Sequence, residues 1–231
     1  MRRMQKEGDG LRILLGTTNP SKAAYFEDLL CGVDAEFVTL ADLGIADEPE
    51  ECGATPEENA KIKAQFYGQF AENVICADSG LYFDELPMDD PRQPGLHVRT
   101  PGGRERLNDA QMVAYYTALA RELGGRALAY YLDGCAVYAA GKVYGFQATR
   151  EEAKSWAFYL TDHTSGWWRE GWPLDSMSQD LDGRWFLDPD RPKFPQEKSA
   201  YRPRLRKFLL ERLGLSTEND KTVDNNECGA E

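Results

Sequence analysis

Short apolar runs separated by polar turns make up the first part of the chain. Residues 11–16 (Leu-Arg-Ile-Leu-Leu-Gly) form such a run, and its length suits a buried strand. Asn19 is a favourable N-cap and Pro20 fits the first helical position, so the sequence predicts a helix over residues 20–31. A second strand is expected near residues 36–40. The order strand, helix, strand is typical of an α/β unit with largely parallel pairing.

The rest of the chain predicts further helices and strands around one long loop. Thr55, followed by Pro56 and Glu58, is typical of a capping box that opens a helix to about residue 70. Residues 87–108 hold several prolines and glycines, which indicates a surface loop. The other expected elements are a strand over 73–77 that ends at Asp78, a helix capped by Asp109 and reaching about residue 123, a hairpin of 129–140 with 142–149, and a last helix over 198–213.

The domain organisation follows from what the chain lacks. The sequence has no internal repeat and no linker long enough to separate two independent domains. We therefore predict a single mixed α/β domain over residues 1–215. Residues 216–231 are polar and acidic with almost no apolar anchors, which predicts a disordered tail.

Composition narrows the class of protein. Hydrophobic residues make up 42% of the chain and aromatic residues 11%, enough for a core in one large domain or two lobes. No apolar run approaches the ~20 residues that span a bilayer, and the charged first ten residues lack the core of a signal peptide. The five cysteines are odd in number and form no C-x-x-C, which argues against a disulfide framework and a zinc site. We expect a cytoplasmic protein with reduced thiols and no membrane association.

The net charge of −12 limits the kind of partner that the protein can bind. Affinity for a nucleic-acid polymer comes largely from Lys and Arg, so the acidic balance argues against such a polymer as the main partner. A small phosphate ligand remains compatible with it, because a few local cations and a metal ion decide its binding.

The segment between the first strand and the first helix is the earliest candidate site. Residues 16–22 (Gly-Thr-Thr-Asn-Pro-Ser-Lys) would place free backbone N–H groups and Lys22 at a helix start, which suits phosphate. The segment is not a Walker loop, because Ser21 and Ala23 stand where Gly and Ser/Thr are needed. Taken alone, such a segment is usually only an ordinary capped helix with a surface lysine.

Two later segments carry further candidates. Asn59 and Lys63 are four residues apart, so they share one face of the predicted second helix, which could also be a plain solvated face. The run Asp78-Ser79-Gly80 follows a predicted strand, where α/β folds place ligand groups, and a carboxylate there can bind Mg²⁺ or polarise water. The alternative is a common Asp-Ser-Gly turn.

These pieces, in this order, resemble the inosine triphosphate pyrophosphatase family, the Ham1-like nucleotidases. The motif T-x-N-x-x-K matches Thr17, Asn19 and Lys22, and E-x-G-x-T-x-E-E-N-A-x-x-K-A matches residues 51–64. D-S-G-L matches residues 78–81, and the P-G motif with a downstream basic residue matches residues 94–99. The first half of the chain is thus covered by specific motifs.

The second half departs from the family pattern. The motif G-F-G-Y-D-P resembles residues 171–176, with Trp172 and Asp175 kept but Leu174 in place of the second aromatic residue. The motif K-x-x-x-S-H-R resembles residues 198–202, two residues short and with Tyr201 in place of the base-reading His. The preference for a particular nucleobase is therefore left open.

The resemblance implies a fold and a reaction. The family fold is a mixed α/β protein with a long twisted sheet, flanking helices, and two lobes around a central cleft, and it is usually a homodimer. The family hydrolyses nucleoside triphosphates with Mg²⁺ to the monophosphate and pyrophosphate. Glu51 and Asp78 are then the metal ligands and catalytic carboxylates, with Asp78 as general base. Lys22, Lys63, Arg99 and Lys198 would supply the counter-charges that a triphosphate needs.

The remaining implied contacts are to the phosphates and to the base. Trp172 would stack on the base and Asp175 would accept from a purine ring N–H. The full set of predicted substrate-binding residues is Thr17, Thr18, Asn19, Lys22, Asn59, Lys63, Ser79, Gly80, Arg99, Trp172, Asp175, Lys198, Tyr201 and Arg202. Three hypotheses remain: this pyrophosphatase acting on deaminated purine nucleotides, the same chemistry on another nucleotide, and a non-catalytic nucleotide-binding protein on the same scaffold.

Overall fold

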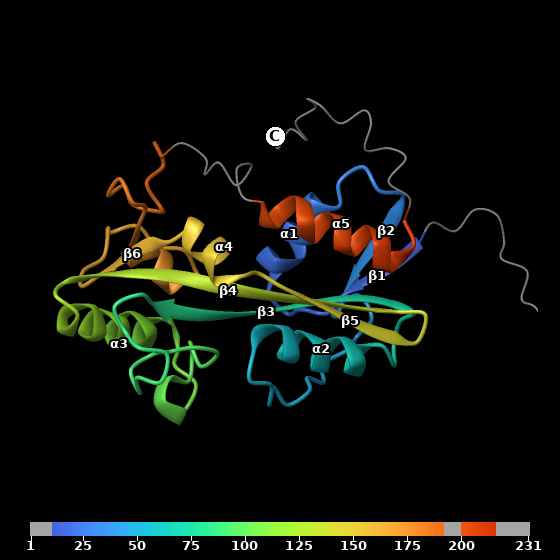
Figure 1. The fold of residues 1–231 in the computed structure, drawn as a ribbon, viewed down its shortest axis with the longest axis horizontal. Coiled ribbons are helices and arrows are strands. Elements are labelled where there is room, and N and C mark those ends of the chain that lie inside the picture. Colours follow the sequence, from blue (N-terminus) through green and yellow to red (C-terminus); the bar gives the residue numbers. More distant parts are fainter. Residues whose placement is uncertain (1–10, 192–199, 216–231) are drawn as a thin grey trace, which may run out of the picture. The chain divides into compact units, whose positions relative to one another are not determined.

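The computed structural model of the chain describes residues 11–191 and 200–215 (Figure 1). Its strands are β1 (Leu11–Leu15), β2 (Ala35–Thr39), β3 (Asn73–Phe83), β4 (Arg126–Ala139), β5 (Lys142–Gln147), β6 (Phe158–Thr161) and β7 (Ser178–Gln179). Its α-helices are α1 (Pro20–Leu29), α2 (Pro56–Tyr67), α3 (Asp109–Glu122), α4 (Arg150–Ser155) and α5 (Tyr201–Leu213), and two 3₁₀ turns are η1 (Pro101–Gly103) and η2 (Pro173–Met177). The strands pair as a seven-stranded sheet in the order β2-β1-β3-β4-β6-β7, with β5 beside β4. The predicted mixed α/β class is confirmed.

The chain divides into two compact units, each made of separated segments. Within the described residues, unit 1 holds 11–78, 134–147 and 200–215, and unit 2 holds 79–133 and 148–191. Strands β3 and β4 each pass from one unit into the other. The single domain over 1–215 stays a prediction, and the tail predicted over 216–231 lies outside the described residues.

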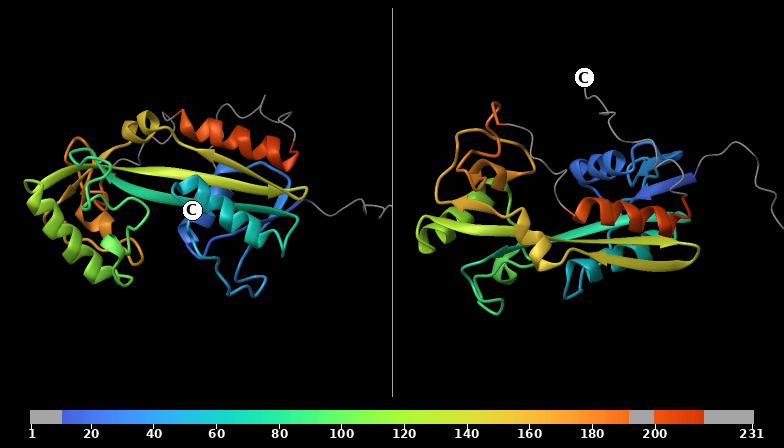
Figure 2. Two further views of the ribbon diagram at one scale, coloured as in Figure 1. Left: turned by 60° about the horizontal axis from the view of Figure 1, so that its bottom comes forward. Right: turned by 45° about the horizontal axis from the view of Figure 1, so that its top comes forward.

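Unit 1 contains the predicted strand–helix–strand arrangement. β1 pairs in parallel with β2, from Leu11 with Ala35 onward, and also in parallel with β3, at Leu14 with Val74. Leu14 packs in the cluster that α2 covers, while α1 and α5 lie on the other face of these strands (Figures 1 and 2). β1 is therefore buried on both faces, which explains its unbroken apolar run.

Helix boundaries in unit 1 follow the predicted caps at their starts but not at their ends. Asn19 and Thr55 both cap as predicted, each accepting from a backbone N–H of the first turn. Glu58 completes the second cap differently, because its carboxylate accepts from the Ala54 N–H. α1 ends at Leu29 rather than residue 31, and α2 ends at Tyr67 rather than residue 70, where the poor helix former Gly68 follows.

Two boundary predictions in unit 2 are wrong. β3 does not end at Asp78 but continues to Phe83, because Leu81 exchanges backbone hydrogen bonds with Gly95 and both Leu81 and Phe83 enter a buried cluster. The N-cap of α3 is Asn108 rather than Asp109, and it forms a capping box with Gln111.

Unit 2 is built on the antiparallel strands β4, β6 and β7. Its core joins side chains of α3, such as Tyr116, to strand residues such as Leu160 and to Leu174 and Met177 of η2. The predicted hairpin of β4 with β5 is confirmed, and residues 87–108 form the predicted loop apart from η1. α4 and β6 were not predicted, although Thr149 and Glu152 form a second capping box at the start of α4.

The last helix is described from Tyr201. Pro203 is tolerated there because it is the third helical residue, where a backbone N–H has no partner within the helix. The helix lies beside α1, where Arg206 donates to the Leu29 and Cys31 carbonyls (Figure 2). Gly214 ends it with φ of 69°, a left-handed conformation that favours glycine.

Candidate active site

The loop after β1 carries the first group of predicted binding residues. Asn19 Oδ1 accepts from the Ser21 N–H at 2.9 Å, and Thr17 Oγ1 accepts from the Asn19 N–H at 3.1 Å. Gly16 leaves no room for a side chain, because a Cβ there would lie 2.4 Å from Cys76 Sγ. The chain therefore turns tightly from β1 into α1, whose first N–H groups and partial positive charge suit an anion.

Two more predicted residues stand in the same short segment. Thr18 donates its hydroxyl proton to the Glu48 carboxylate at 3.3 Å. Lys22 belongs to the first turn of α1, and its backbone N–H donates to the Asn19 carbonyl at 3.1 Å. Unit 1 thus brings the three residues of the first motif and Thr18 together in one short segment.

Three charged side chains of unit 1 meet just past the end of β1. Lys63 Nζ lies 2.6 Å from Glu51 Oε1 and 3.7 Å from Asp78 Oδ1. α2 supplies the lysine, β3 supplies the aspartate, and the segment between β2 and α2 supplies the glutamate. The two carboxylates predicted for metal binding and catalysis therefore share one ammonium group.

The surroundings of Lys63 keep it charged. Burial alone would lower the pKa of Lys63, but the carboxylates of Asp78 and Glu51 outweigh burial and hold that pKa above its usual value. The side chains of Lys63 and Asp78 are 17% and 14% exposed, whereas that of Glu51 is 41% exposed. The ion pair is thus partly shielded from water, where charge interactions are stronger, while Glu51 still reaches solvent.

Asn59 joins Asp78 to the loop that carries Glu51. Its Nδ2 donates to Asp78 Oδ2 at 2.9 Å, and its Oδ1 accepts from the Gly53 N–H at 2.8 Å, two residues from Glu51. Asn59 is only 3% exposed, and it shares with Lys63 the helix face that the sequence predicts. Gly53 is required because a Cβ there would lie 2.7 Å from Asn59 Oδ1. Asn59 therefore orients Asp78 and the loop before α2, and its direct contact with substrate stays a prediction.

The donor set of unit 1 fits Mg²⁺. Glu51 and Asp78 are hard oxygen donors that already surround one cation, the Lys63 ammonium. Among residues 11–191 and 200–215, no group of three or more His, Cys, Asp or Glu side chains could hold a metal ion. Mg²⁺ needs no such cage, since it commonly binds through one or two carboxylates, substrate phosphates and water.

The two predicted residues of α5 are engaged within unit 1. Tyr201 is 7% exposed, and its ring centroid lies 5.7 Å from that of Phe146. Arg202 forms an ion pair with Asp28 of α1 and lies over the Tyr25 ring at 5.5 Å. Lys198, the third predicted residue of this motif, lies outside the described residues.

In unit 2, Arg99 takes part in a network of hydrogen bonds. Its Nη1 donates to Asp109 Oδ1 at 2.9 Å and to the Leu107 carbonyl at 3.3 Å, and its Nη2 donates to the Gly171 carbonyl at 3.2 Å. The Gly171 N–H donates to Asp109 Oδ2 at 2.8 Å. Gly171 immediately precedes Trp172, so this network reaches the segment predicted to hold the base.

The base-binding candidates Trp172 and Asp175 lie close together at η2. Arg169 stands between them, with its guanidinium carbon 5.3 Å from the Trp172 ring centroid and Nη1 3.6 Å from Asp175 Oδ2. Burial raises the pKa of Asp175, although Arg169 and Arg191 oppose that effect. Leu174, the departure from the family motif, is 5% exposed and belongs to the core of unit 2.

The last two predicted residues of unit 2 lie on β3. Ser79 is half-buried, and Gly80 is buried. A Cβ at Gly80 would lie 2.9 Å from the Tyr82 ring and 3.1 Å from the Gly95 carbonyl oxygen. Gly80 is therefore required by packing, whatever further role it has.

Two residues of this region were missed by sequence reasoning. Asp109 was predicted only as a helix cap, although Asn108 beside it is an equally good cap and leaves the aspartate available. Arg169 carries no local signal in the sequence, and its neighbours Trp167 and Trp168 are 41% and 55% exposed.

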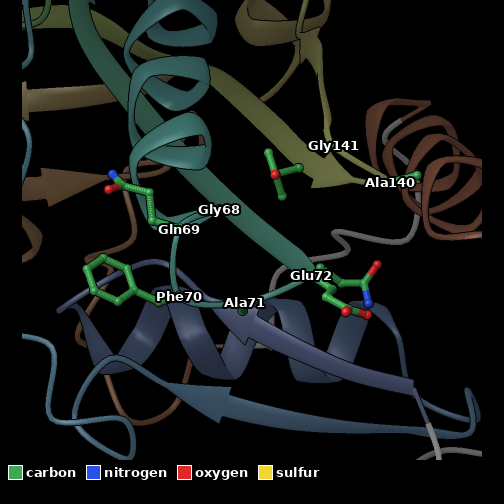
Figure 3. Close-up of a pocket in the computed structure, with 9 residues that line it drawn as sticks. Gly68, Gln69, Phe70, Ala71, Glu72, Ala140 and Gly141 are labelled. Atoms are coloured by element: carbon green, nitrogen blue, oxygen red, sulfur yellow. The ribbon is translucent and has the colours of Figure 1, made fainter. Parts of the chain in front are cut away.

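A cavity of about 590 Å³ in unit 1 lies apart from all of these residues (Figure 3). It is lined by Gly68, Gln69, Phe70, Ala71, Glu72, Asn73, Tyr138, Ala140 and Gly141. None of the predicted site residues lines it. The cavity therefore does not alter the candidate site.

The sequence matches the Ham1 family over residues 13–153. The chain belongs to the Ham1 family. The match covers both carboxylates and Lys63, as well as the loop after β1 and Arg99. It ends before Trp172 and Asp175, in agreement with the departures from the family motifs in the second half.

Curated relatives match the chain over part of their length. The chain is 36% identical to the dITP/XTP pyrophosphatase of Thermoanaerobacter sp. strain X514 over 38% of this chain and 42% of that protein. It is 40% identical to the dITP/XTP pyrophosphatase of Oceanobacillus iheyensis over 42% of this chain and 48% of that protein. The chain thus matches less than half the length of these relatives.

Solved structures extend the likeness to most of the chain. The Ham1 protein of Staphylococcus aureus superimposes with a TM-score of 0.62 and 20% identity, covering 87% of this chain and 98% of that one. This likeness shows that the Ham1 fold continues through the second half. In the ranges 11–191 and 200–215, every helix is too short or too polar to cross a membrane.

Proposed function

We propose that this chain hydrolyses a nucleoside triphosphate to the monophosphate and pyrophosphate, with deaminated purine nucleotides as substrates. Membership of the Ham1 family and the names of the matched relatives support this activity. The observation that carries it is the meeting of Lys63, Glu51 and Asp78 in unit 1. A protein that only bound nucleotides would not need two carboxylates beside Lys63, the cation proposed to bind phosphate.

The charged residues of unit 1 take distinct roles in this proposal. Lys63 and Lys22 neutralise phosphate oxygens, and Thr17, Thr18 and Asn19 add hydrogen bonds. Asp78 accepts a proton from the attacking water. The water oxygen forms a bond to phosphorus while the bond from that phosphorus to the oxygen between the α and β phosphates breaks. Asn59 holds Oδ2 of Asp78. We assign that water to Oδ1, which lies 3.7 Å from Lys63 Nζ.

Glu51 and Asp78 are the residues that would hold Mg²⁺. When bound, the ion supplies positive charge to the phosphate oxygens and makes a bound water more acidic. The Lys63 ammonium offsets part of the negative charge that the two carboxylates bring together.

Trp172 and Asp175 of unit 2 are assigned to the base. The indole offers a flat apolar face for stacking, and the carboxylate can accept from a purine ring N–H. A second candidate, the same chemistry on another nucleotide, is favoured by Leu174, which lies in the core and offers no second aromatic wall.

Pyrophosphate release across a nucleotide panel tests the proposal. The full chain is assayed with inosine, xanthosine, guanosine and adenosine triphosphates and with dITP, with Mg²⁺ and with a chelator. We expect metal-dependent release, fastest with the deaminated purines. Release fastest with another nucleotide would favour the second candidate. Binding without release would show a non-catalytic nucleotide-binding protein.

A homodimer and a cytoplasmic location complete the proposal. Cys31 and Cys52 are exposed cysteines, which suits a reducing compartment. Sedimentation equilibrium of the full chain tests the homodimer, for which about twice the chain mass of 26.0 kDa is expected.

A further inference from the structure

Both backbone polar groups of Gly171 are held by one ion pair. The Gly171 N–H donates to Asp109 at 2.8 Å, and the Gly171 carbonyl accepts from Arg99 at 3.2 Å. Arg99 and Asp109 are themselves joined at 2.9 Å, with their side chains 26% and 24% exposed. A loop residue is thus fixed at both ends by side chains more than sixty positions away in the chain.

The backbone of Gly171 explains why such a fixed point matters. Its φ is +77°, which side-chain-bearing residues rarely adopt. From there the chain enters η2 through Trp172, whose N–H donates to the Arg169 carbonyl and whose carbonyl accepts from the Asp175 N–H, both at 3.1 Å. The direction of the indole therefore depends on how Gly171 is held.

We propose that Arg99 and Asp109 are positioning residues that fix Trp172 for stacking on the base, and that Arg99 does not serve as a phosphate counter-charge. This inference rests on the proposed function, because the base is assigned to Trp172 there. The guanidinium of Arg99 already donates to three acceptors of unit 2, one of them a carboxylate. The positive charge is balanced by Asp109, which lessens its pull on an anion.

Arg99→Lys separates the two roles. Lysine keeps the positive charge but lacks the planar fork that reaches Asp109 and two carbonyls together. A phosphate counter-charge would therefore be largely retained, whereas the hold on Gly171 would be lost. Asp109→Asn tests the same network from the other side, because an amide cannot accept from both Arg99 and Gly171 as the carboxylate does. Arg121→Lys is the matched control, since Arg121 pairs with Asp162 in the same unit at 3.6 Å.

The readout is the affinity for inosine triphosphate divided by the affinity for inorganic tripolyphosphate, both by calorimetry with Mg²⁺. This ratio isolates the contribution of the nucleoside and does not depend on turnover if binding is measured with Asp78→Asn as background. We expect Arg99→Lys and Asp109→Asn to lower the ratio about 2- to 12-fold, the equivalent of one aromatic stacking contact. Arg121→Lys should leave the ratio unchanged.

A double-mutant cycle tells positioning from general damage. If Arg99 acts through Trp172, Arg99→Lys should not lower the ratio further in a Trp172→Ala background. An unchanged ratio in Arg99→Lys, whether or not the affinity for tripolyphosphate falls with that for the nucleotide, would overturn the inference. A wild-type ratio near one would also overturn it, because no base contact would then exist to position. A lowered ratio in a protein that releases no pyrophosphate would support the positioning role while refuting the proposed activity.

Discussion

Asp78 is the carboxylate whose removal should separate chemistry from binding. Its Oδ2 accepts from Asn59 at 2.9 Å, and Oδ1 faces Lys63 at 3.7 Å. In Asp78→Asn the amide keeps the shape but cannot take a proton from water. We expect pyrophosphate release to fall by about 10²- to 10⁴-fold, the usual contribution of a general base. Nucleotide binding by calorimetry should remain measurable, since the lysines and Trp172 are unchanged.

Asp34→Asn is the matched control for this variant. Asp34 is an exposed carboxylate of unit 1 outside the proposed site, so the same change of charge should leave turnover unchanged. Near wild-type turnover by Asp78→Asn would show that another group accepts the proton.

Lys63 should also contribute to stability, because it is the shared counter-charge of two carboxylates. Lys63→Met leaves Asp78 and Glu51 facing each other without it. We expect a loss of about 1–3 kcal/mol at pH 7, less than for a fully buried pair because Glu51 reaches solvent. Urea denaturation followed by circular dichroism measures it. Lys61→Met, which breaks an exposed pair with Glu57 on the same helix, should cost less than about 0.5 kcal/mol.

The pH dependence of this deficit has a defined sign. The pKa of Lys63 is raised in the folded protein, so its stabilisation is complete below the ordinary lysine pKa and is lost only as pH rises through the higher folded value. The wild-type contribution is therefore constant near neutrality. The deficit of Lys63→Met should therefore hold from neutral pH up to the ordinary lysine pKa of about 10.4 and shrink only above it. A deficit independent of pH would indicate lost packing instead.

At the scale of elements, the contact between α2 and the β4–β5 hairpin in unit 1 depends on two glycines. A Cβ at Gly134 would lie 2.3 Å from the Glu57 backbone nitrogen, which cannot move without shifting the start of α2. A Cβ at Gly145 would meet Glu57 Oε1 and Lys61 Cε at 2.2 Å, both at the ends of flexible side chains. The two glycines are thus equally crowded, but a side chain at Gly134 would have to displace backbone and one at Gly145 only the ends of side chains.

Gly134→Ala and Gly145→Ala should therefore differ in stability. We expect a cost of about 1–3 kcal/mol for Gly134→Ala, the usual penalty of overpacking, and less than about 1 kcal/mol for Gly145→Ala. Thermal denaturation of both variants beside the wild type measures the difference. Equal costs would mean that the start of α2 is free to shift.

The elements that the sequence predicts well are those with local signals. Asn19 with Pro20, and Thr55 with Pro56, name the starts of α1 and α2 because caps act within one helical turn. β3 beyond Asp78 could not be predicted, because its continuation depends on hydrogen bonds between Leu81 and Gly95 across a loop. The ends of α1 and α2 were predicted less accurately than their starts, because no capping side chain in the sequence marks them.

The site follows a similar rule. Motif order identified Glu51, Lys63 and Asp78, which then proved to be in contact. The pairing of Arg99 with Asp109 and Gly171 could not be predicted from the sequence, since these residues belong to no common local pattern.

At the scale of the molecule, the two units carry different natural probes. All five tryptophans (Trp156, Trp167, Trp168, Trp172 and Trp185) lie in unit 2. The buried cysteines Cys76 and Cys135, each 1% exposed, lie in unit 1. The chain passes between the units within β3 and β4, where strand hydrogen bonds continue on both sides of each crossing. Unfolding one unit would therefore break strands that the other needs.

We expect both units to unfold in one cooperative transition, as a single domain over 1–215 requires. Tryptophan emission in urea reports unit 2, and labelling of Cys76 and Cys135 at about pH 8 reports unit 1. Burial raises the pKa of the Cys76 thiol, so the folded protein should label slowly and the unfolded protein quickly. Cys31→Ser, Cys52→Ser and Cys228→Ser together remove the background without touching either buried thiol. Coincident midpoints are expected, whereas labelling that precedes or follows the change in emission would show two domains that unfold independently.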